Sequence, residues 1–492
     1  MKIVFVASEC VPYSKTGGLA DVVGALPKAL ASLGYEVEIF TPRYKVTKPG
    51  AVVPGAESLT IPLSGGFKFA SIQVAEEISG VRTYLMDCPE LFDRDDLYMS
   101  NGKDYPDNAE RFAAFSMAAL EFAKRSSNPP AVFHCHDWQS ALLPVYLRSL
   151  YAADPFYRNT SVLFTIHNIG YQGLFPPEVM AQISISKDLF RIEGLEYYGK
   201  INLLKGGIVF SDYVSTVSQK YAQEIQTDEF GHGLEGVLRS RADRLIGILN
   251  GVDYEDWDPA TDRLIPANYS PENMRGKEIC KKSLLEKLGV HNPDLERPVI
   301  GIVSRFVKQK GFDLIAQIAD ELMREDLYVV ALGTGEPEYE DLFRSLAEKY
   351  PEKFLVKIAY DNALAHQIEA GADMFLMPSR YEPCGLNQIY SMKYGTVPVV
   401  RATGGLDDTV HPFDGDKGTG FRFRQYSAVA LLACLQRAIA TYRDKSAWSK
   451  LQQNCMKEDF SWTQSARKYA SLYENLYAGK IGASVSTVTA FS

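Results

Sequence analysis

The most informative stretch of this sequence is KIVFVAS (Lys2–Ser8), followed by the turn KTGG (15–18) and by LADVVGALPKALASL (Leu19–Leu33). The first segment is a short apolar run of the kind found in buried strands, whereas the last carries its apolar residues at helical spacing. Glu36–Phe40 (EVEIF) then has the pattern of a second strand. A strand, a helix and a second strand in this order predict a βαβ unit and therefore a parallel sheet covered by helices.

The same alternation of strand-like and helix-like segments continues along most of the chain. Further strand-like runs lie at Ala131–Phe133, Ser161–Ile166, Tyr213–Val217, Val299–Ser304, Leu327–Leu332, Phe354–Ile358, Met374–Met377 and Val397–Arg401. Residues 51–87 differ, because they show period-two alternation and Gly-bearing turns, which are typical of β-hairpins. We therefore predict an α/β protein with two doubly wound, Rossmann-like domains.

A polar stretch that contains Pro and Asp, residues 253–297, separates the two halves. We place the domain border there, with an N-terminal domain over residues 1–255 and a C-terminal domain that begins at residue 256 and ends at 461. The final residues (GKIGASVSTVTAFS, 479–492) are mostly small and polar. Terminal segments of this kind are commonly poorly ordered, so we predict a loose tail over residues 481–492.

The composition excludes several classes of protein. The 492 residues include 52 Lys and Arg against 61 Asp and Glu, which gives a formal net charge of −9. A net acidic chain is a poor candidate for a nucleic-acid-binding protein, whose affinity comes from neutralising phosphates. No uncharged apolar run of about 18 residues occurs, so we expect no membrane span. The seven cysteines are scattered and form no CxxC pair, which argues against a disulfide framework and a zinc site.

Two Gly-bearing turns have similar sequences, TGGLADVV (16–23) and TGGLDDTV (403–410). Each follows a strand and precedes a helix, where backbone N–H groups and the helix dipole favour an anion. Lys15 adds a positive charge beside the first turn. The pattern fits either two plain tight turns or two loops that serve one shared ligand.

Two cations and a carboxylate follow strands of the second half. Arg305 and Lys310 lie in SRFVKQKG (304–311), and Glu382 begins EPCGL (382–386). Ligands of open α/β sheets bind beyond the carboxyl ends of the strands, so the two cations suit a phosphate. Glu382 is either a ligand-binding group or a carboxylate that is stabilised by the start of a helix.

Polar residues also follow two strands of the first half. HCHDW (134–138) contains Asp137 and Trp138, which together suit a sugar, because the carboxylate binds hydroxyls and the indole offers an apolar face. His167 is either a core histidine or a ligand-binding group. Asp-x-Asp patterns occur in three unrelated loops, and we assign them to solvated loops rather than to a metal site. They are Asp93/Asp95, Asp256/Asp258 and Asp414/Asp416.

Taken together, these segments resemble the family of bacterial glycogen synthases and plant starch synthases. The resemblance extends over nearly the whole chain, in the order of the family's motifs. The motifs are KTGGLADVVGALPKAL (15–30), HCHDWQSALLP (134–144), FTIHNIGYQG (164–173), GILNGVD (247–253), VSRFVKQKG (303–311), PSRYEPCGLNQIY (378–390) and RATGGLDDTV (401–410).

The resemblance implies a glycosyltransferase B fold, in which two Rossmann-like domains face each other across a deep cleft. It also implies that the last helix, at about 462–480, packs back on the first domain. The implied reaction is transfer of glucose from ADP-glucose to the non-reducing end of an α-1,4-glucan or maltooligosaccharide, with retention of configuration. No metal or other cofactor is expected, and the implied location is the bacterial cytoplasm or, for a plant chain, the plastid stroma or starch granule.

The resemblance also assigns roles to individual residues. The implied catalytic residues are Glu382, Arg305, Lys310, His167 and Asp137. The implied contacts of the nucleotide-sugar donor are Lys15, Gly17, Gly18, Tyr360, Cys384, Gly385, Leu386, Thr403, Gly404 and Gly405. The implied glucose or acceptor contacts are Asn250, Trp138 and Asp21.

One position departs from the wider fold class, in which a second Glu follows the first by eight residues. This sequence has Tyr390 there, so ribose recognition is not assigned to a Glu. Three other readings stay open: a non-catalytic glucan-binding protein, a sugar-nucleotide 2-epimerase, and a phosphorylase that uses pyridoxal phosphate. A glucan-binding protein would not need Arg305, Lys310 and Glu382 together, and an epimerase would not need the region 51–101.

Overall fold

The computed structural model describes residues 1–47, 52–63, 66–100 and 102–489. The chain divides into two compact units. The first comprises Met1–Val217, Ala222–Gly251 and Trp462–Ser492, and the second comprises Ser218–Tyr221 and Val252–Ser461. The boundary after Gly251 lies four residues before the expected border, which follows residue 255.

The first unit contains a nine-stranded sheet with the order β14-β13-β9-β8-β1-β2-β5-β4-β3. Neighbours from β14 to β5 are parallel, whereas β4 pairs antiparallel with both β5 and β3. The strands are β1 (Lys2–Val6), β2 (Glu36–Pro42), β3 (Val52–Leu63), β4 (Gly66–Ala75), β5 (Val81–Asp87), β8 (Val132–His136), β9 (Ser161–Ile166), β13 (Tyr213–Thr216) and β14 (Leu245–Gly247). The β-hairpins predicted within residues 51–87 are therefore present, and they extend the parallel sheet at one edge.

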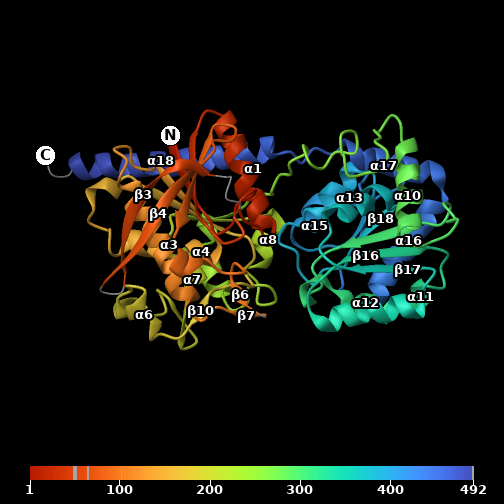
Figure 1. The fold of residues 1–492 in the computed structure, drawn as a ribbon, viewed down its shortest axis with the longest axis horizontal. Helices are drawn as coiled ribbons and strands as arrows, with labels where there is room; N and C mark the ends of the chain where they lie inside the picture. Colours follow the sequence, from red (N-terminus) through yellow and green to blue (C-terminus); the bar gives the residue numbers. More distant parts are fainter. Residues whose placement is uncertain (48–51, 64–65, 101, 490–492) are drawn as a thin grey trace. The chain divides into compact units, whose positions relative to one another are not determined.

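Helices cover both faces of this sheet (Figure 1). Ile3 and Phe5 of β1 pack in one buried cluster with residues of α1 and α18, whereas Phe40 of β2 stacks on Phe115 of α3 on the other side. The helices of the N-terminal half of the sequence are α1 (Gly18–Ser32), α2 (Pro89–Phe92), α3 (Asn108–Ala123), α4 (Asp137–Ser140), α5 (Leu142–Arg148), α6 (Val179–Gln182), α7 (Leu203–Phe210), α8 (Gln219–Glu224) and α9 (Glu235–Arg239).

The last helix, α18 (Trp462–Thr489), belongs to the first unit, as the resemblance implied. Tyr469 and Tyr473 are fully buried in the same cluster as Phe5. The predicted loose tail is wrong over residues 481–489, where the backbone is helical. No proline interrupts this stretch, so the helix continues through its small residues. Residues 490–492 lie outside the described residues.

The second unit contains a six-stranded, wholly parallel sheet with the order β17-β16-β15-β18-β19-β20. Its strands are β15 (Val299–Val303), β16 (Tyr328–Gly333), β17 (Phe354–Ile358), β18 (Met374–Met377), β19 (Val397–Arg401) and β20 (Phe421–Phe423). Its principal helices are α10 (Arg275–Lys287), α11 (Phe312–Leu322), α12 (Pro337–Lys349), α13 (Asn362–Gly371), α14 (Asn387–Lys393), α15 (Gly404–Thr409), α16 (Ala428–Arg443) and α17 (Lys445–Lys457).

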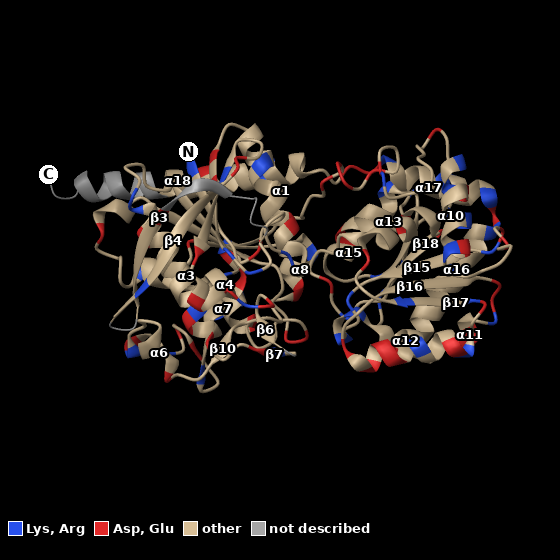
Figure 2. Ribbon diagram, in the orientation of Figure 1, with Lys and Arg blue, Asp and Glu red and all other residues tan. Residues whose placement is uncertain are grey.

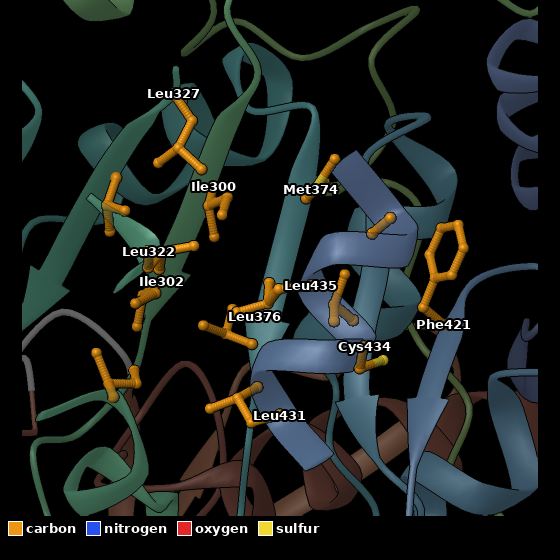
Figure 3. Close-up of a cluster of buried hydrophobic side chains, with 14 of the residues drawn as sticks. Ile300, Ile302, Leu322, Leu327, Met374, Leu376, Phe421, Leu431, Cys434 and Leu435 are labelled. Atoms are coloured by element: carbon orange, nitrogen blue, oxygen red, sulfur yellow. The ribbon is translucent and has the colours of Figure 1, made fainter. Parts of the chain in front are cut away.

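The core of the second unit lies on both faces of its sheet. On one face, Leu431, Cys434 and Leu435 of α16 pack against β15 and β18 (Figure 3). On the other face, leucines of α10 and α13 pack against β15 and β16. Each fully buried aliphatic side chain contributes about 1.5–3 kcal/mol, so this layered packing is the principal source of stability.

The apolar patterns of the strands account for this burial. The central strands β15, β16 and β18 carry no charged residue, and Figure 2 shows the charges of this unit mainly on helices and loops. Within the part of the chain that the structure describes, no helix is both long and apolar enough to span a membrane. All seven cysteines are free and buried.

Candidate active site

A buried carboxylate holds the first Gly turn of the N-terminal unit. Glu9 lies just after β1 and is 3% exposed. Its carboxylate accepts hydrogen bonds from the backbone N–H groups of Thr16 (2.5 Å) and Gly17 (3.2 Å) and from the Thr16 hydroxyl (2.6 Å). The Tyr98 hydroxyl donates to the same carboxylate at 2.6 Å. Glu9 was not predicted from the sequence, although its place at the carboxyl end of a parallel strand is a usable signal.

The same turn brings together Lys15 and Asp21, two predicted ligand contacts. Lys15 Nζ lies 2.6 Å from Asp21 Oδ1, and both side chains are partly exposed. Exposed ion pairs of this kind contribute about 0–1 kcal/mol, so Lys15 can exchange its partner for a phosphate at little cost. A Cβ atom added to Gly17 would meet no atom within 4 Å, which leaves open space beside the turn. Gly18 follows as the first residue of α1.

Asp137 and His167 also lie together, at the ends of β8 and β9. Asp137 Oδ1 accepts the backbone N–H of His167 at 2.7 Å. Asp137 opens α4 with a φ of +54°, a left-handed conformation that non-glycine residues rarely adopt. Strain of this kind costs on the order of 1–3 kcal/mol and clusters at functional sites. Burial raises the pKa of the Asp137 carboxyl to about 7, although the backbone N–H groups of His167 and Asn168 act in the opposite direction.

Three histidines form a row behind this strand edge. His136 Nδ1 lies 3.0 Å from His167 Nε2. The rings of His134 and His136 lie 4.1 Å apart between centroids, and His134 binds the hydroxyls of Thr165 (2.6 Å) and Tyr473 (2.7 Å). Burial lowers the pKa of His167 to about 3. Burial also lowers the pKa of His134 and His136 well below the usual value, so the three rings are neutral near pH 7.

Trp138, a predicted glucose or acceptor contact, is largely buried. Its side chain is 8% exposed, and its ring packs against Phe112 (5.0 Å between centroids) and Phe175 (6.0 Å). A Cβ atom on Gly173 would lie 2.6 Å from the indole, so the glycine permits this packing. The predicted contact between Trp138 and a sugar stays a prediction, and the packing of its ring against Phe112 and Phe175 fixes the orientation of the indole.

Asn250, the remaining candidate of the first unit, is buried at 5% exposure. Its Oδ1 has no hydrogen-bond partner within the described residues. A buried amide oxygen without a partner is costly, and a ligand hydroxyl would satisfy it. The predicted glucose or acceptor contact of Asn250 stays a prediction.

The second unit joins Lys310 to Glu382. Lys310 Nζ lies 2.6 Å from Glu382 Oε2, and the Ser379 hydroxyl donates to the same oxygen at 3.0 Å. Glu382 is 6% exposed, so its charge is held in a poorly solvated place next to a fixed cation. The sequence predicted both residues as separate candidates, and it did not predict their ion pair or the part of Ser379.

The second Gly turn packs directly on the Glu382 loop. The Gly405 N–H donates to the backbone oxygens of Glu382 and Pro383, both at 3.1 Å. A Cβ atom would lie 1.9 Å from the Glu382 oxygen if it were added to Gly404, and 2.0 Å from the Cys384 oxygen if it were added to Gly405. Glycine is therefore required here by close approach of two backbones. Thr403, the residue before the turn, is fully buried.

A third loop completes this arrangement. Gly311 has a φ of +75°, and a Cβ atom there would lie 2.1 Å from the Pro378 oxygen. The Arg380 N–H donates to the Gln309 oxygen at 2.8 Å. The loops after β15, β18 and β19 are thus interlocked, which places Lys310, Glu382 and the turn 403–405 at one edge of the sheet.

Other predicted contacts of the second unit lie at or near the same edge. Cys384 is buried, Gly385 has a φ of +71°, and Leu386 precedes α14. Arg305 is exposed, and its guanidinium makes no hydrogen bond or ion pair with any described residue. Tyr360 is 83% exposed in the loop after β17, so its ring is accessible to a base.

Tyr390, which stands where many relatives of the wider fold class have a second Glu, packs in the core. Its ring stacks on that of Trp257 at 4.2 Å between centroids, and Trp257 stacks in turn on His366 at 3.7 Å. The role of Tyr390 is therefore packing.

The three Asp-x-Asp patterns are solvated loops in which one aspartate pairs with a lysine. The pairs are Asp95–Lys45, Asp258–Lys393 and Asp416–Lys450. Among the described residues, no group of three or more His, Cys, Asp or Glu side chains is arranged to hold a metal ion.

Comparison with known proteins agrees with this geometry. The model of the starch synthase catalytic domain matches residues 2–240, and that of glycosyl transferases group 1 matches residues 286–455. The glycogen synthase of Koribacter versatilis is 54% identical over 476 residues, which cover 96% of this chain and 98% of that protein. The glycogen synthase of Thermotoga maritima is 44% identical over 492 aligned residues, which cover 98% of this chain and 100% of that protein.

Solved structures give the same result. The catalytic domain of Starch Synthase IV from Arabidopsis thaliana, bound to ADP and acarbose, is 33% identical with a TM-score of 0.89, over 97% of this chain and 99% of that one. Sucrose-phosphate synthase from Thermosynechococcus elongatus, at 20% identity and a TM-score of 0.62, shares the fold.

Two Rossmann-like units with polar loops at the carboxyl ends of parallel strands define a glycosyltransferase of the B fold. More narrowly, the chain belongs to the family of glycogen and starch synthases, and it is a glucosyltransferase that acts on a glucan.

Proposed function

We propose that this chain transfers glucose from ADP-glucose to the non-reducing end of an α-1,4-glucan, with retention of configuration and without a metal ion. The observation that carries the proposal is the edge of the second sheet, where Lys310, Glu382 and the turn 403–405 are held together by interlocked loops. The relative solved with ADP and acarbose supports the choice of an adenine nucleotide and an oligosaccharide.

The second unit would hold the nucleoside diphosphate. A departing diphosphate gains negative charge, and donors that are fixed in advance stabilise such charge best. Lys310 is fixed by Glu382, and Arg305 has its guanidinium available for a phosphate. These groups supply the positive charge that a metal ion supplies in other transferases.

The first unit would hold the glucose and additional phosphate charge. His167 and Asp137 are placed by a direct hydrogen bond, and Gly17 leaves room beside the first turn for the donor. Lys15 would exchange Asp21 for phosphate.

We propose a same-face substitution for the chemical step. The bond between C1 of glucose and the phosphate oxygen breaks, and a bond from C1 to the acceptor 4-hydroxyl oxygen forms. The departing phosphate oxygen takes the hydroxyl proton. The products are ADP and a glucan that is longer by one glucose.

Nucleotide release from ADP-glucose and from UDP-glucose, each with and without a maltooligosaccharide, tests this function. We expect release that depends on the oligosaccharide, is faster with ADP-glucose, and survives EDTA. Release without an acceptor, a preference for UDP-glucose, or loss in EDTA that Mg²⁺ restores would each contradict the corresponding part of the proposal.

Arg305→Ala tests the role of the cations, with Lys308→Ala as a matched control in the same loop. Removing one preorganised donor costs about 10²–10³ in kcat. We expect that loss for Arg305→Ala and a change of less than about twofold for Lys308→Ala, whose side chain is exposed and unpaired within the described residues. Equal effects of the two substitutions would remove Arg305 from the mechanism.

A further inference from the structure

His136 has no role in the reaction as proposed, yet it contacts a residue that does. Its side chain is fully buried, and its ring stacks on Phe5 at 5.4 Å between centroids and lies beside His134. Its Nδ1 lies 3.0 Å from Nε2 of His167. The proton shared by these two nitrogens determines which nitrogen of His167 can donate to a substrate.

Both rings are neutral near pH 7. Burial lowers the pKa of His136 well below its usual value, and it lowers that of His167 to about 3. A neutral imidazole has one N–H donor and one acceptor nitrogen. In the contact between the two rings, therefore, only one nitrogen carries the proton.

The surroundings of His136 favour one direction for this hydrogen bond. Nε2 of His136 has no hydrogen-bond partner among the residues that the structure describes. If His167 were the donor, the proton of His136 would sit on Nε2, and a buried N–H would be unpaired at a cost of about 1–3 kcal/mol. If His136 donates from Nδ1, the unpaired atom is an acceptor, which proteins tolerate more often than an orphaned N–H.

We propose that His136 is a positioning residue that donates from Nδ1 to Nε2 of His167 and so keeps the proton of His167 on Nδ1. His167 then presents a hydrogen-bond donor to a hydroxyl oxygen of the donor glucose. The second part of this inference rests on the proposed function, in which His167 contacts that glucose. The backbone N–H of His167 donates to Asp137 Oδ1 at 2.7 Å, which fixes the position of the residue. Both this position and the placement of the ring proton on Nδ1 are therefore set before substrate binds.

Nitrogen NMR of the full chain labelled with ¹⁵N-histidine tests the proton position without substrate. The chain has seven histidines, and His167→Asn identifies the signals of His167. We expect a protonated Nδ1 and a bare Nε2 on His167 near pH 7. A protonated Nε2 would overturn the inference. A protonated Nδ1 supports it even if ADP-glucose proves not to be the donor, so the two proposals can fail separately.

Variants of His136 test the consequence for turnover. His136→Phe keeps an aromatic ring in the stack and removes the donor nitrogen, so we expect a mixture of His167 tautomers and a kcat lowered by about 10-fold, the value of one hydrogen bond. His136→Asn places an N–H near the original Nδ1 and should restore most of this loss. Failure of Asn to restore turnover in a folded variant would count against the inference.

His134→Phe is the matched control for a purely structural effect. It removes the bonds to Thr165 and Tyr473 in the same row, and should lower stability without moving the proton of His167. A change of His167 tautomer in this variant would contradict the assignment to His136.

A donor lacking one hydroxyl locates the contact. Among ADP-glucose analogues that each lack one sugar hydroxyl, one should reduce the difference in kcat between the wild type and His136→Phe to less than about twofold, because the oxygen that His167 would bind is missing. An unchanged difference with every analogue would overturn the contact between His167 and a hydroxyl of the donor glucose.

Discussion

The two Gly turns of this chain have nearly the same sequence, but their glycines meet different needs. Gly17 of the first turn corresponds to Gly404 of the second. Beside Gly17 there is open space, whereas an added Cβ atom would lie 1.9 Å from the Glu382 oxygen on Gly404 and 2.0 Å from the Cys384 oxygen on the next residue, Gly405. The first turn leaves room next to its backbone. The second uses the absence of side chains to bring its own backbone against the loop of Glu382.

The glutamates beside the two turns, Glu9 and Glu382, contact these turns through different atoms. The carboxylate of Glu9 accepts hydrogen bonds from N–H groups and from a hydroxyl of the first turn. Glu382 binds the second turn through its backbone oxygen, which leaves the carboxylate to Lys310 and Ser379. A repeated motif therefore predicts a similar backbone path. The packing around each turn decides whether it supports a neighbouring loop or leaves space beside its backbone.

Gly405→Ala should have the largest effect if the second turn is a support. The new methyl group would clash with backbone atoms that have no flexible end to move, so we expect destabilisation of about 3 kcal/mol or more and loss of activity. Chemical denaturation and turnover measure this. Wild-type stability in this variant would show that the two turns are equivalent after all.

Glu382→Gln separates the carboxylate of Glu382 from its backbone oxygen, which keeps supporting the turn. The amide preserves the shape and the bond from Ser379 but removes the charge that faces Lys310. We expect kcat to fall by about 10²–10³ with stability nearly unchanged. Steady-state kinetics and thermal unfolding, with the exposed Glu338→Gln as a control, distinguish this from a purely structural carboxylate, for which turnover would persist.

Gly17→Ala places a methyl group in the open turn, at the position that corresponds to Gly404 in the second turn. Gly17 has a φ of −153°, which any residue adopts, and its surroundings are empty. We expect the free energy of unfolding to stay within about 0.5 kcal/mol of the wild type. The KM for the donor should rise by about 10-fold, because the methyl group occupies space that the ligand would use. A donor KM equal to that of the wild type would mean that this space is not part of the site.

Asp137→Asn tests the pH dependence of the free energy of unfolding. The pKa of Asp137 is raised from 3.8 to about 7, so between these values the folded state holds a proton that the unfolded state releases. The wild type therefore loses stability as pH rises through this window, by on the order of 4 kcal/mol. Asp137→Asn lacks this loss, so its free energy of unfolding relative to that of the wild type should increase from pH 4 to pH 8. Denaturation across this range that shows parallel curves would contradict the assignment.

The sequence predicted the strands well because parallel strands are buried on both faces. Phe354–Ile358, Met374–Met377 and Val397–Arg401 have the same bounds in the structure. The three-residue strands β14 and β20 were not predicted, because a run that short has no measurable period.

Site residues were predictable where they follow strands and unpredictable where distant packing decides their role. Asp137, His167, Lys310 and Glu382 follow strands or belong to recognisable motifs. The sequence does not show that Gly173, thirty-five residues after Trp138, leaves the space in which the Trp138 ring packs. The contacts of Glu9 and His136 likewise depend on partners that the sequence does not place beside them.

The return of α18 to the first unit has a consequence for synthesis on the ribosome. Tyr469 and Tyr473 complete the cluster around Phe5, so the unit that contains the N-terminus lacks part of its core until the last helix has been made. The second unit is almost contiguous, from Val252 to Ser461, and has nearly all of its residues earlier. The first unit begins to leave the ribosome before the second, but the second has all of its residues sooner. A chain released before Trp462 would therefore contain a complete second unit and a first unit with part of its apolar core exposed.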